Sequence, residues 1–407
     1  MSAALVAIVA VFLWFVFKVL NINSQSQKPR VYCNDTDFLA VLVKMVPNLD
    51  ESYFPTRLWG YNGHIQTIVH SIIGRVKCPW PIGERCVLVL SDGSTLTFDL
   101  YQPIVKAKCD LTIVVVPGIC NTSESVYIRT FVHYAQCHGF RCAVLNHLGA
   151  LSSVPLTAPR IFSYGHTGDL YEMVEHISKR FPSSKIVCLG YSMGGNLVTK
   201  YLGETIHPKP KNIVGAVSIC QGYDIVRGTF WLLQWQNFRR FYLYAITEAM
   251  KNIILRHRST LLSENAKQEY GLAEKEIIAA ATLPELDDAY TRKVHGFTNL
   301  SELYEWSSSI NYLKNINVPI VFVNSLDDPL IPDVLLDPLK EHASTNEKTA
   351  YVELLHGGHL GFYEGGFLYP NTVTWLDRTL IDMVAMFDSL PMLKLPHKSS
   401  HASEINF

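Results

Sequence analysis

Short apolar runs rich in β-branched residues alternate with amphipathic stretches along most of the chain. Such runs predict strands that are buried on both faces of a sheet. They cover residues 111–116, 141–146, 186–189, 212–220, 318–324 and 349–355. Helical spacing of apolar residues marks the segments 124–137, 167–180, 196–202 and 371–386. This alternation predicts an α/β fold with a mostly parallel sheet and helices on both faces.

Three regions depart from this succession of strands and helices. Residues 84–101 alternate as two strands joined by a turn at 91–94, whereas 38–46 reads as a short helix after a polar linker at 26–32. Residues 229–254 are aromatic and amphipathic, and helices continue to about residue 313. An insertion here predicts a cap over an apolar pocket suited to a lipid chain. Helices that only pack on the core, or that contact a membrane surface, are the alternatives.

The N-terminus begins with an unbroken apolar run over residues 3–17, extended beyond Lys18. This length predicts a membrane-spanning helix if Lys18 reaches the headgroups. No Lys or Arg precedes the run and no good cleavage site follows it, which favours an uncleaved anchor over a signal peptide. We therefore expect a single-pass protein of the endoplasmic reticulum or plasma membrane.

The orientation of this anchor is less sharply indicated. Lys18, Lys28 and Arg30 all follow the apolar run, so the positive-inside rule places the large domain on the cytosolic side. Three glycosylation sequons favour the opposite side but carry little weight, because such short motifs arise by chance. They begin at Asn34, Asn121 and Asn299.

Length and composition limit the remaining possibilities. The 407 residues predict an anchor (1–22), a linker and N-terminal extension (23–84), an α/β domain (85–388) with its cap insertion at about 224–313, and a flexible tail (389–407). The net charge of −1 argues against a nucleic-acid partner. Nine cysteines without paired spacing indicate buried thiols and not a disulfide framework or zinc site. We expect no metal and no cofactor, since no phosphate- or dinucleotide-binding fingerprint is present.

One stretch has the pattern of a catalytic nucleophile. The sequence KIVCLGYSMGGNLVTK at 185–200 places a strand, a G-x-S-x-G turn and a helix in succession. Such a turn exposes its serine, here Ser192, at the carboxyl end of a sheet. Gly190 and Gly194 are needed because a side chain at either position would clash with the neighbouring strand or helix. The alternatives are a small-residue turn without chemistry, or a degenerate site.

A second loop fits the oxyanion side of such a site. The strand at 111–116 ends in Pro117-Gly118-Ile119-Cys120-Asn121. In acyl-transfer hydrolases, this loop supplies one backbone N–H to the oxyanion hole and the residue after the serine supplies another. The donors would be Ile119 and Met193. An ordinary strand-to-helix loop is the alternative.

Two late loops offer an acid and a base. After the strand at 318–324, Asp328 directly precedes Pro-Leu-Ile-Pro and is preferred over Asp327 as the acid that orients an imidazole. After the last strand, His359 lies in the Gly-rich sequence HGGHLG and is preferred over His356 as general base. The order Ser192, Asp328, His359 is that of α/β-hydrolases and differs from those of chymotrypsin and subtilisin.

Taken together, these motifs resemble the membrane-anchored α/β-hydrolases related to bacterial YheT-type esterases. The resemblance covers about residues 58–375 and rests on Trp59, His64-Ile65-Gln66-Thr67, Pro117-Gly118, Tyr127, GYSMGGN, Asp287-Asp288, Thr291, Gly296-Phe297, Asp327-Asp328-Pro329 and HGGHLGF. It implies Ser192 as nucleophile, Asp328 as acid and His359 as base. It also implies membrane anchoring and, by resemblance alone, a steroid as a further ligand. The H-x-x-x-x-D acyltransferase motif of some members is absent from this sequence, which argues against acyl transfer to lysolipids.

The sequence therefore predicts a serine hydrolase of lipid carboxylic esters, with a monoacylglycerol as the preferred substrate and an acyl-enzyme intermediate. A phospholipase or short-chain esterase on the same triad is one alternative. A lipid- or steroid-binding receptor with little turnover is another. The roles of His64 and Gln66 stay open at this point.

Overall fold

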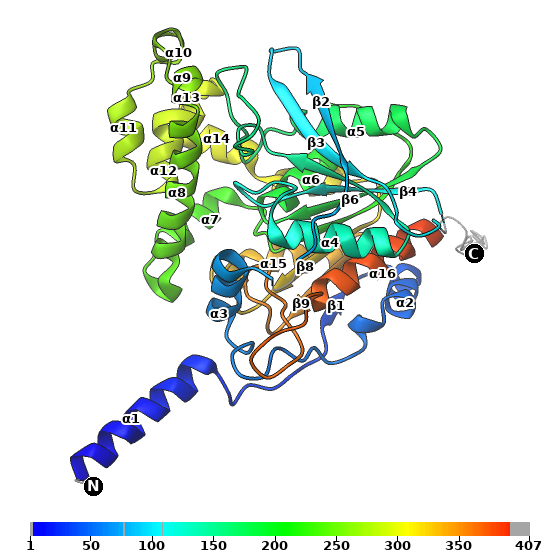
Figure 1. Ribbon diagram of the computed structural model, residues 1–407. Coiled ribbons are helices and arrows are strands. Elements are labelled where there is room, and N and C mark those ends of the chain that lie inside the picture. The colour runs from blue at the N-terminus through cyan, green and yellow to red at the C-terminus, as the bar shows by residue number, and fades with distance from the viewer. Residues whose placement is uncertain (1–2, 76–77, 108, 391–407) are drawn as a thin grey trace, which may run out of the picture.

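A single twisted sheet organises the chain in the computed structural model, which describes residues 3–75, 78–107 and 109–390 (Figure 1). The nine strands lie in the order β1-β9-β8-β7-β6-β4-β5-β3-β2. They are β1 (Arg30–Tyr32), β2 (Glu84–Val89), β3 (Thr95–Tyr101), β4 (Leu111–Val116), β5 (Arg141–Asn146), β6 (Lys185–Tyr191), β7 (Ile213–Ile219), β8 (Ile320–Ser325) and β9 (Thr349–Leu354). Strands β4 to β9 pair in parallel, and β1–β9, β3–β5 and β2–β3 pair antiparallel. The predicted mostly parallel sheet is confirmed.

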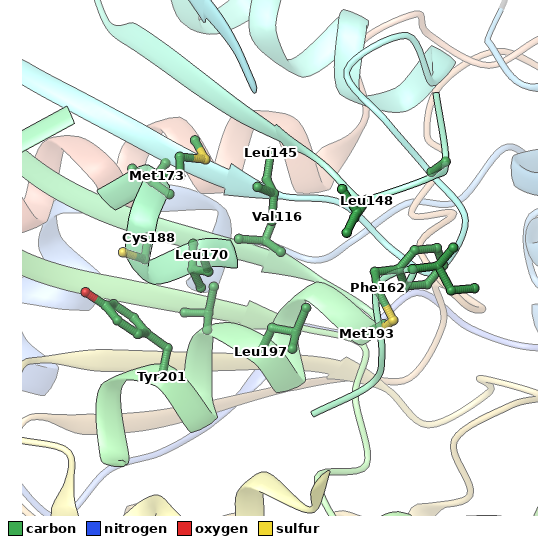
Figure 2. Close-up of a cluster of buried hydrophobic side chains, with 14 of the residues drawn as sticks. Val116, Leu145, Leu148, Phe162, Leu170, Met173, Cys188, Met193, Leu197 and Tyr201 are labelled. Carbon is green, nitrogen blue, oxygen red and sulfur yellow. The ribbon is translucent and has the colours of Figure 1, made fainter. Parts of the chain in front are cut away.

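Helices cover both faces of this sheet, because consecutive residues of a buried strand point to opposite sides. Ile113 and Val115 of β4 pack with one group of helices, whereas Val114 and Val116 pack with another. Figure 2 shows the second core, to which Val116 of β4, Cys188 of β6 and Tyr201 of α6 all contribute buried side chains. The helices outside the cap region are α1 (Ala3–Leu20), α2 (Thr36–Met45), α3 (Gly63–Ile68), α4 (Val126–Cys137), α5 (Gly168–Arg180), α6 (Met193–Gly203), α15 (Asp337–Thr345) and α16 (Trp375–Ser389).

The helices between β7 and β8 gather beside one end of the sheet (Figure 1). The amphipathic stretch at 229–254 is not one helix, since Asn237 and Phe238 have φ values of 51° and 53°. That left-handed conformation cannot continue a right-handed helix, and the short element η3 (Gln236–Phe238), which contains both residues, separates α7 from α8. These cap helices are α7 (Ile225–Leu232), α8 (Arg239–Arg256), α9 (Arg258–Leu261), α10 (Glu264–Tyr270), α11 (Glu274–Ala279), α12 (Leu283–Leu286), η4 (Asp287–Thr291), α13 (Arg292–Val294), α14 (Leu300–Ser307) and η5 (Ser309–Asn315).

The predicted single-pass anchor is wrong, and with it the assignment to a membrane of the endoplasmic reticulum or cell surface. Within residues 3–75, 78–107 and 109–390, no helix combines the length and apolar character needed to cross a bilayer. Helix α1 has 18 residues.

Two smaller expectations also change. Residues 26–32 are not all linker, because Arg30–Tyr32 forms the edge strand β1 and pairs antiparallel with β9. A three-residue strand held by backbone pairing leaves no hydrophobic pattern for sequence reasoning to detect. Of the tail expected at 389–407, only residues 389 and 390 fall within the described residues.

Candidate active site

The turn between β6 and α6 places Ser192 in a strained conformation. Its φ of 53° and ψ of −121° lie outside the regions that L-residues favour. The neighbouring glycines permit this turn. A Cβ on Gly190 would lie 2.2 Å from the carbonyl oxygen of Gly194, and one on Gly194 would lie 2.0 Å from that of Val116. Both glycines are therefore required by close backbone approach, as the G-x-S-x-G spacing predicts.

The loop after β4 lies directly beside this serine. A Cβ on Gly118 would be 3.5 Å from Cβ of Ser192, which is van der Waals contact. Two side chains fix the loop: the backbone N–H of Gly118 donates to Tyr127 Oη at 2.9 Å, and His147 Nε2 donates to the Pro117 carbonyl at 2.9 Å. Burial lowers the pKa of His147 to about 4, so this imidazole is neutral at physiological pH.

The oxyanion donors expected from the sequence lie in this region. Met193 is the first residue of α6, where a helix leaves its N–H groups without intrahelical acceptors. Ile119 lies in the loop after β4, one residue beyond Gly118. Ile119 and Met193 both line the apolar cavity described below. Ile119 and Met193 therefore remain the predicted oxyanion donors, beside the turn that carries Ser192.

The structure brings Ser192, His359 and Asp328 into one hydrogen-bonded chain. Ser192 Oγ lies 2.8 Å from His359 Nε2, and His359 Nδ1 lies 2.7 Å from Asp328 Oδ2. The other carboxylate oxygen of Asp328 accepts from the backbone N–H groups of Leu330 and Ile331 at 2.8 and 3.1 Å. The Asp328 side chain is fully buried. The carboxylate can therefore hold the Nδ1 proton and leave Nε2 as the proton acceptor for Ser192.

The competing residues of each loop form a pair of their own. Asp327 Oδ2 lies 3.2 Å from His356 Nδ1, and its Oδ1 accepts from the backbone N–H of Gly358 at 2.8 Å. The other ring nitrogen of His356, Nε2, lies 2.7 Å from Ser24 Oγ and not beside Ser192. The two aspartates and two histidines that competed in the sequence therefore form two separate His–Asp pairs. Only the pair of His359 and Asp328 contacts Ser192.

Sequence reasoning missed the residues that hold the histidine loop. Thr67 Oγ1 accepts from the backbone N–H of His359 at 2.8 Å, and Gln66 Oε1 accepts from the backbone N–H of Tyr363 at 2.9 Å. Gln66 Nε2 donates to the Gly60 carbonyl at 2.6 Å. The motif at 64–67 was visible, but its contacts are with residues almost 300 positions away. Its role is to fasten the loop that carries His359.

His64 of the same motif contacts the cap helices instead. Its Nδ1 lies 2.9 Å from Tyr242 Oη of α8, and its ring stacks on that of Tyr242 with centroids 5.9 Å apart. Burial lowers the pKa of His64. It therefore links α3 to α8 and does not approach Ser192 by any hydrogen bond found among the described residues.

An apolar cavity lies between these loops and the cap helices. It contains about 810 Å³ of free space, part of it open to solvent. Ile119 and Met193 line it together with a few polar groups, among them Tyr164, Gln221 and Asp287. The apolar lining includes Phe162, Leu232, Leu243, Met250, Leu283 and Leu335. Such a cavity suits a hydrocarbon chain with a small number of polar contacts.

A family model described as "alpha/beta hydrolase fold" matches residues 112–366. The chain belongs to the α/β-hydrolase family. Abhydrolase domain-containing protein 2 of Drosophila melanogaster is 60% identical, over 94% of this chain and 96% of that protein. Human monoacylglycerol lipase ABHD2 is 43% identical, over 92% of this chain and 89% of that protein. Human phospholipase ABHD3 is 27% identical, over 89% and 86%.

These similarities confirm the resemblance and place this α/β-hydrolase with abhydrolase domain-containing protein 2. They extend over nearly the whole chain, so they include the helices between β7 and β8 as well as the sheet. Among the described residues, no group of three or more His, Cys, Asp or Glu side chains could hold a metal ion.

Proposed function

We propose that this α/β-hydrolase is a serine hydrolase of lipid carboxylic esters, and that its substrate is a monoacylglycerol. The observation that carries the proposal is the chain of short contacts from Ser192 through His359 to Asp328. A nucleophile within hydrogen-bond reach of a base, itself oriented by a buried carboxylate, is the arrangement that activates a serine.

The reaction would proceed through an acyl-enzyme. His359 Nε2 takes the Ser192 proton as Oγ attacks the ester carbonyl, and the negative oxygen of the tetrahedral intermediate accepts from the N–H groups of Ile119 and Met193. His359 then gives the proton to the departing alcohol. Water, deprotonated by the same imidazole, attacks the acyl-enzyme and releases the fatty acid. Asp328 stabilises the imidazolium in both half-reactions.

The cavity and the relatives support a lipid substrate. The largely apolar lining next to Ile119 and Met193 can take up an acyl chain as Ser192 attacks its ester. A relative that is 43% identical over most of both chains is named a monoacylglycerol lipase. A steroid ligand stays an implication of the resemblance alone.

The alternatives to a monoacylglycerol lipase differ from it in the head group of the substrate, in the length of its acyl chain or in the rate of turnover. A relative at 27% identity is named a phospholipase, which makes a phospholipid the main competing substrate. A short-chain esterase or a binding protein with little turnover would keep the same fold. Hydrolysis rates on esters of each class separate these possibilities.

The test compares the purified protein with Ser192→Ala on a monoacylglycerol, a phospholipid with the same acyl chain, and a short-chain ester. We expect the monoacylglycerol to have the highest kcat/KM, and Ser192→Ala to lower kcat by at least about 10³-fold, as for nucleophile removal in other triads. His356→Ala is the matched control, since His356 does not contact Ser192. Comparable rates for Ser192→Ala and the unchanged protein would overturn the proposal, and a phospholipid preference would assign the competing substrate.

A further inference from the structure

The Asp287-Asp288…Thr291 motif is not used by the triad, although Asp287 and Thr291 both line the cavity. Asp287 begins η4 in the cap helices, directly after α12. It lines the same cavity as Ile119 and Met193, amid mostly apolar side chains. Its neighbour Asp288 is exposed instead and pairs with Arg292 at 2.7 Å. Two adjacent carboxylates therefore have opposite environments, and only one of them faces the space proposed for the substrate.

The carboxylate of Asp287 has few partners for a group in such surroundings. Tyr304 Oη donates to Asp287 Oδ2 at 2.9 Å, and the polar side chain of Thr291 lies nearby and lowers the pKa of the carboxyl against the larger, opposite effect of burial. Among the described residues, no Lys, Arg or His comes within 4.0 Å of it to form an ion pair. A carboxylate has about four acceptor positions. Part of its acceptor capacity is therefore unused, and the side chain lines a cavity where a ligand can use it.

The protein retains this carboxylate at a cost. Burial raises the pKa of Asp287 to about 6, because low-dielectric surroundings disfavour the charged form. A structural role in joining Tyr304 to η4 would be met as well by a neutral amide. A polar group kept in an apolar pocket is the usual sign of a contact that fixes the orientation of a ligand.

We propose that Asp287 and Tyr304 form a subsite that binds a hydroxyl group of the ester substrate. The hydroxyl donates to a carboxylate oxygen of Asp287, whose other contacts keep it in place. A hydroxyl suits the cavity because a neutral donor costs less to bury than an ammonium ion. A quaternary ammonium head group has no N–H to donate. The proposal rests on the proposed function, since it concerns the substrate of Ser192.

The hydroxyl could belong to either half of the substrate. It is carried by the glycerol of a monoacylglycerol, or by the acyl chain of a hydroxy-fatty-acyl ester. Three substrates with one chain length distinguish these sources. They are a monoacylglycerol with a plain chain, the ethyl ester of a hydroxylated chain, and the ethyl ester of the plain chain, which has no hydroxyl.

The experiment measures kcat/KM for the three esters with the unchanged protein, Asp287→Leu, Asp287→Asn and the matched control Asp288→Asn. We expect the preference for a hydroxyl-bearing ester over the plain ethyl ester to fall about 10- to 100-fold in Asp287→Leu, the range for a hydrogen bond to a charged group. Asp287→Asn should lose less, because its amide oxygen still accepts, and Asp288→Asn should keep the full preference. A loss confined to the monoacylglycerol identifies glycerol as the source, and a loss confined to the hydroxylated chain identifies the acyl half.

Labelling of Ser192 by a fluorophosphonate, measured in parallel, separates the two proposals. Variants that are labelled at the normal rate but keep the full hydroxyl preference would overturn the subsite and leave the proposed function intact. An unchanged protein with no hydroxyl preference would do the same. If the unchanged protein neither hydrolyses an ester nor becomes labelled, the proposed function itself fails. If Asp287→Leu does not fold, the near-isosteric Asp287→Asn variant decides. A larger fall in hydroxyl preference in Asp287→Asn than in Asp288→Asn supports the subsite, and an equal preference in the two variants refutes it.

Discussion

Exchanging each carboxylate of the adjacent pair Asp327 and Asp328 for an amide should have very different effects on catalysis. Asp328→Asn preserves the shape of the side chain but can place an NH₂ group against His359 Nδ1, where Asp328 Oδ2 now lies at 2.7 Å. The imidazole would then carry its proton on Nε2 and could not accept the proton of Ser192. In a serine protease with a Ser-His-Asp triad this exchange lowers kcat about 10⁴-fold, or about 5.5 kcal/mol.

The expected effect of Asp327→Asn is much smaller. Its amide oxygen can still accept from the backbone N–H of Gly358, and the contact with His356 at 3.2 Å does not involve Ser192. Loss of one such hydrogen bond costs about 0.5–1.5 kcal/mol, which corresponds to at most roughly 12-fold if all of it appears in kcat. The two variants should therefore differ by about three orders of magnitude.

The assay is steady-state hydrolysis of a monoacylglycerol by both variants between pH 6 and 9, with thermal melting to verify the fold. Asp328→Asn should recover part of its activity at high pH, where hydroxide can replace the missing base. If Asp327→Asn lost more activity than Asp328→Asn in folded protein, the assignment of the acid would be refuted.

Three further variants test the supports of the site. Thr67→Val removes the acceptor of the His359 backbone N–H and should lower kcat about 10-fold with KM nearly unchanged, as measured by steady-state kinetics. Burial raises the pKa of Asp287 from its ordinary 3.8 to about 6. Between pH 3.8 and about pH 6 the native state therefore keeps a proton that the unfolded state has lost, and the free energy of unfolding falls as the pH rises through this range. Asp287→Asn should therefore stabilise the protein by up to about 3 kcal/mol above pH 6 and very little at pH 4, and an equal melting-temperature change at both pH values would contradict the burial argument. Gly194→Ala places a Cβ 2.0 Å from a backbone oxygen of β4 and should lower the melting temperature by about 5–10 °C or prevent folding, whereas Gly228→Ala, whose Cβ meets nothing closer than 3.7 Å, should melt normally.

The central strands could be predicted from sequence because their burial leaves a direct signal. The runs at 111–116 and 141–146 coincide with β4 and β5, since strands buried on both faces are mostly apolar. The edge strand β1 left no such signal. The break at 237–238 was also hidden, because aromatic residues continue the amphipathic pattern across it. The apolar N-terminal run predicted a spanning helix, whereas no helix among the described residues is long and apolar enough to cross a bilayer.

The candidate site could be predicted in parts. Ser192 and its glycines were visible because the turn restricts residue type within a few positions. The sequence favoured Asp328 over Asp327 because Asp328 directly precedes Pro-Leu-Ile-Pro, but only the structure shows which carboxylate lies against which histidine. The same holds for Thr67, whose partner His359 is 292 positions away. Asp287 was visible as part of a motif, but only the cavity shows why it differs from Asp288.

Covalent labelling tests the central claim most directly. The protein, Ser192→Ala and His359→Ala are treated with a fluorophosphonate probe, and the modified residue is identified by mass spectrometry of peptides. The account predicts one rapidly labelled residue, Ser192, with no label in Ser192→Ala and labelling slowed by orders of magnitude in His359→Ala, since activation of the serine requires the base. A folded protein that remains unlabelled, or label on a serine other than Ser192, would contradict it.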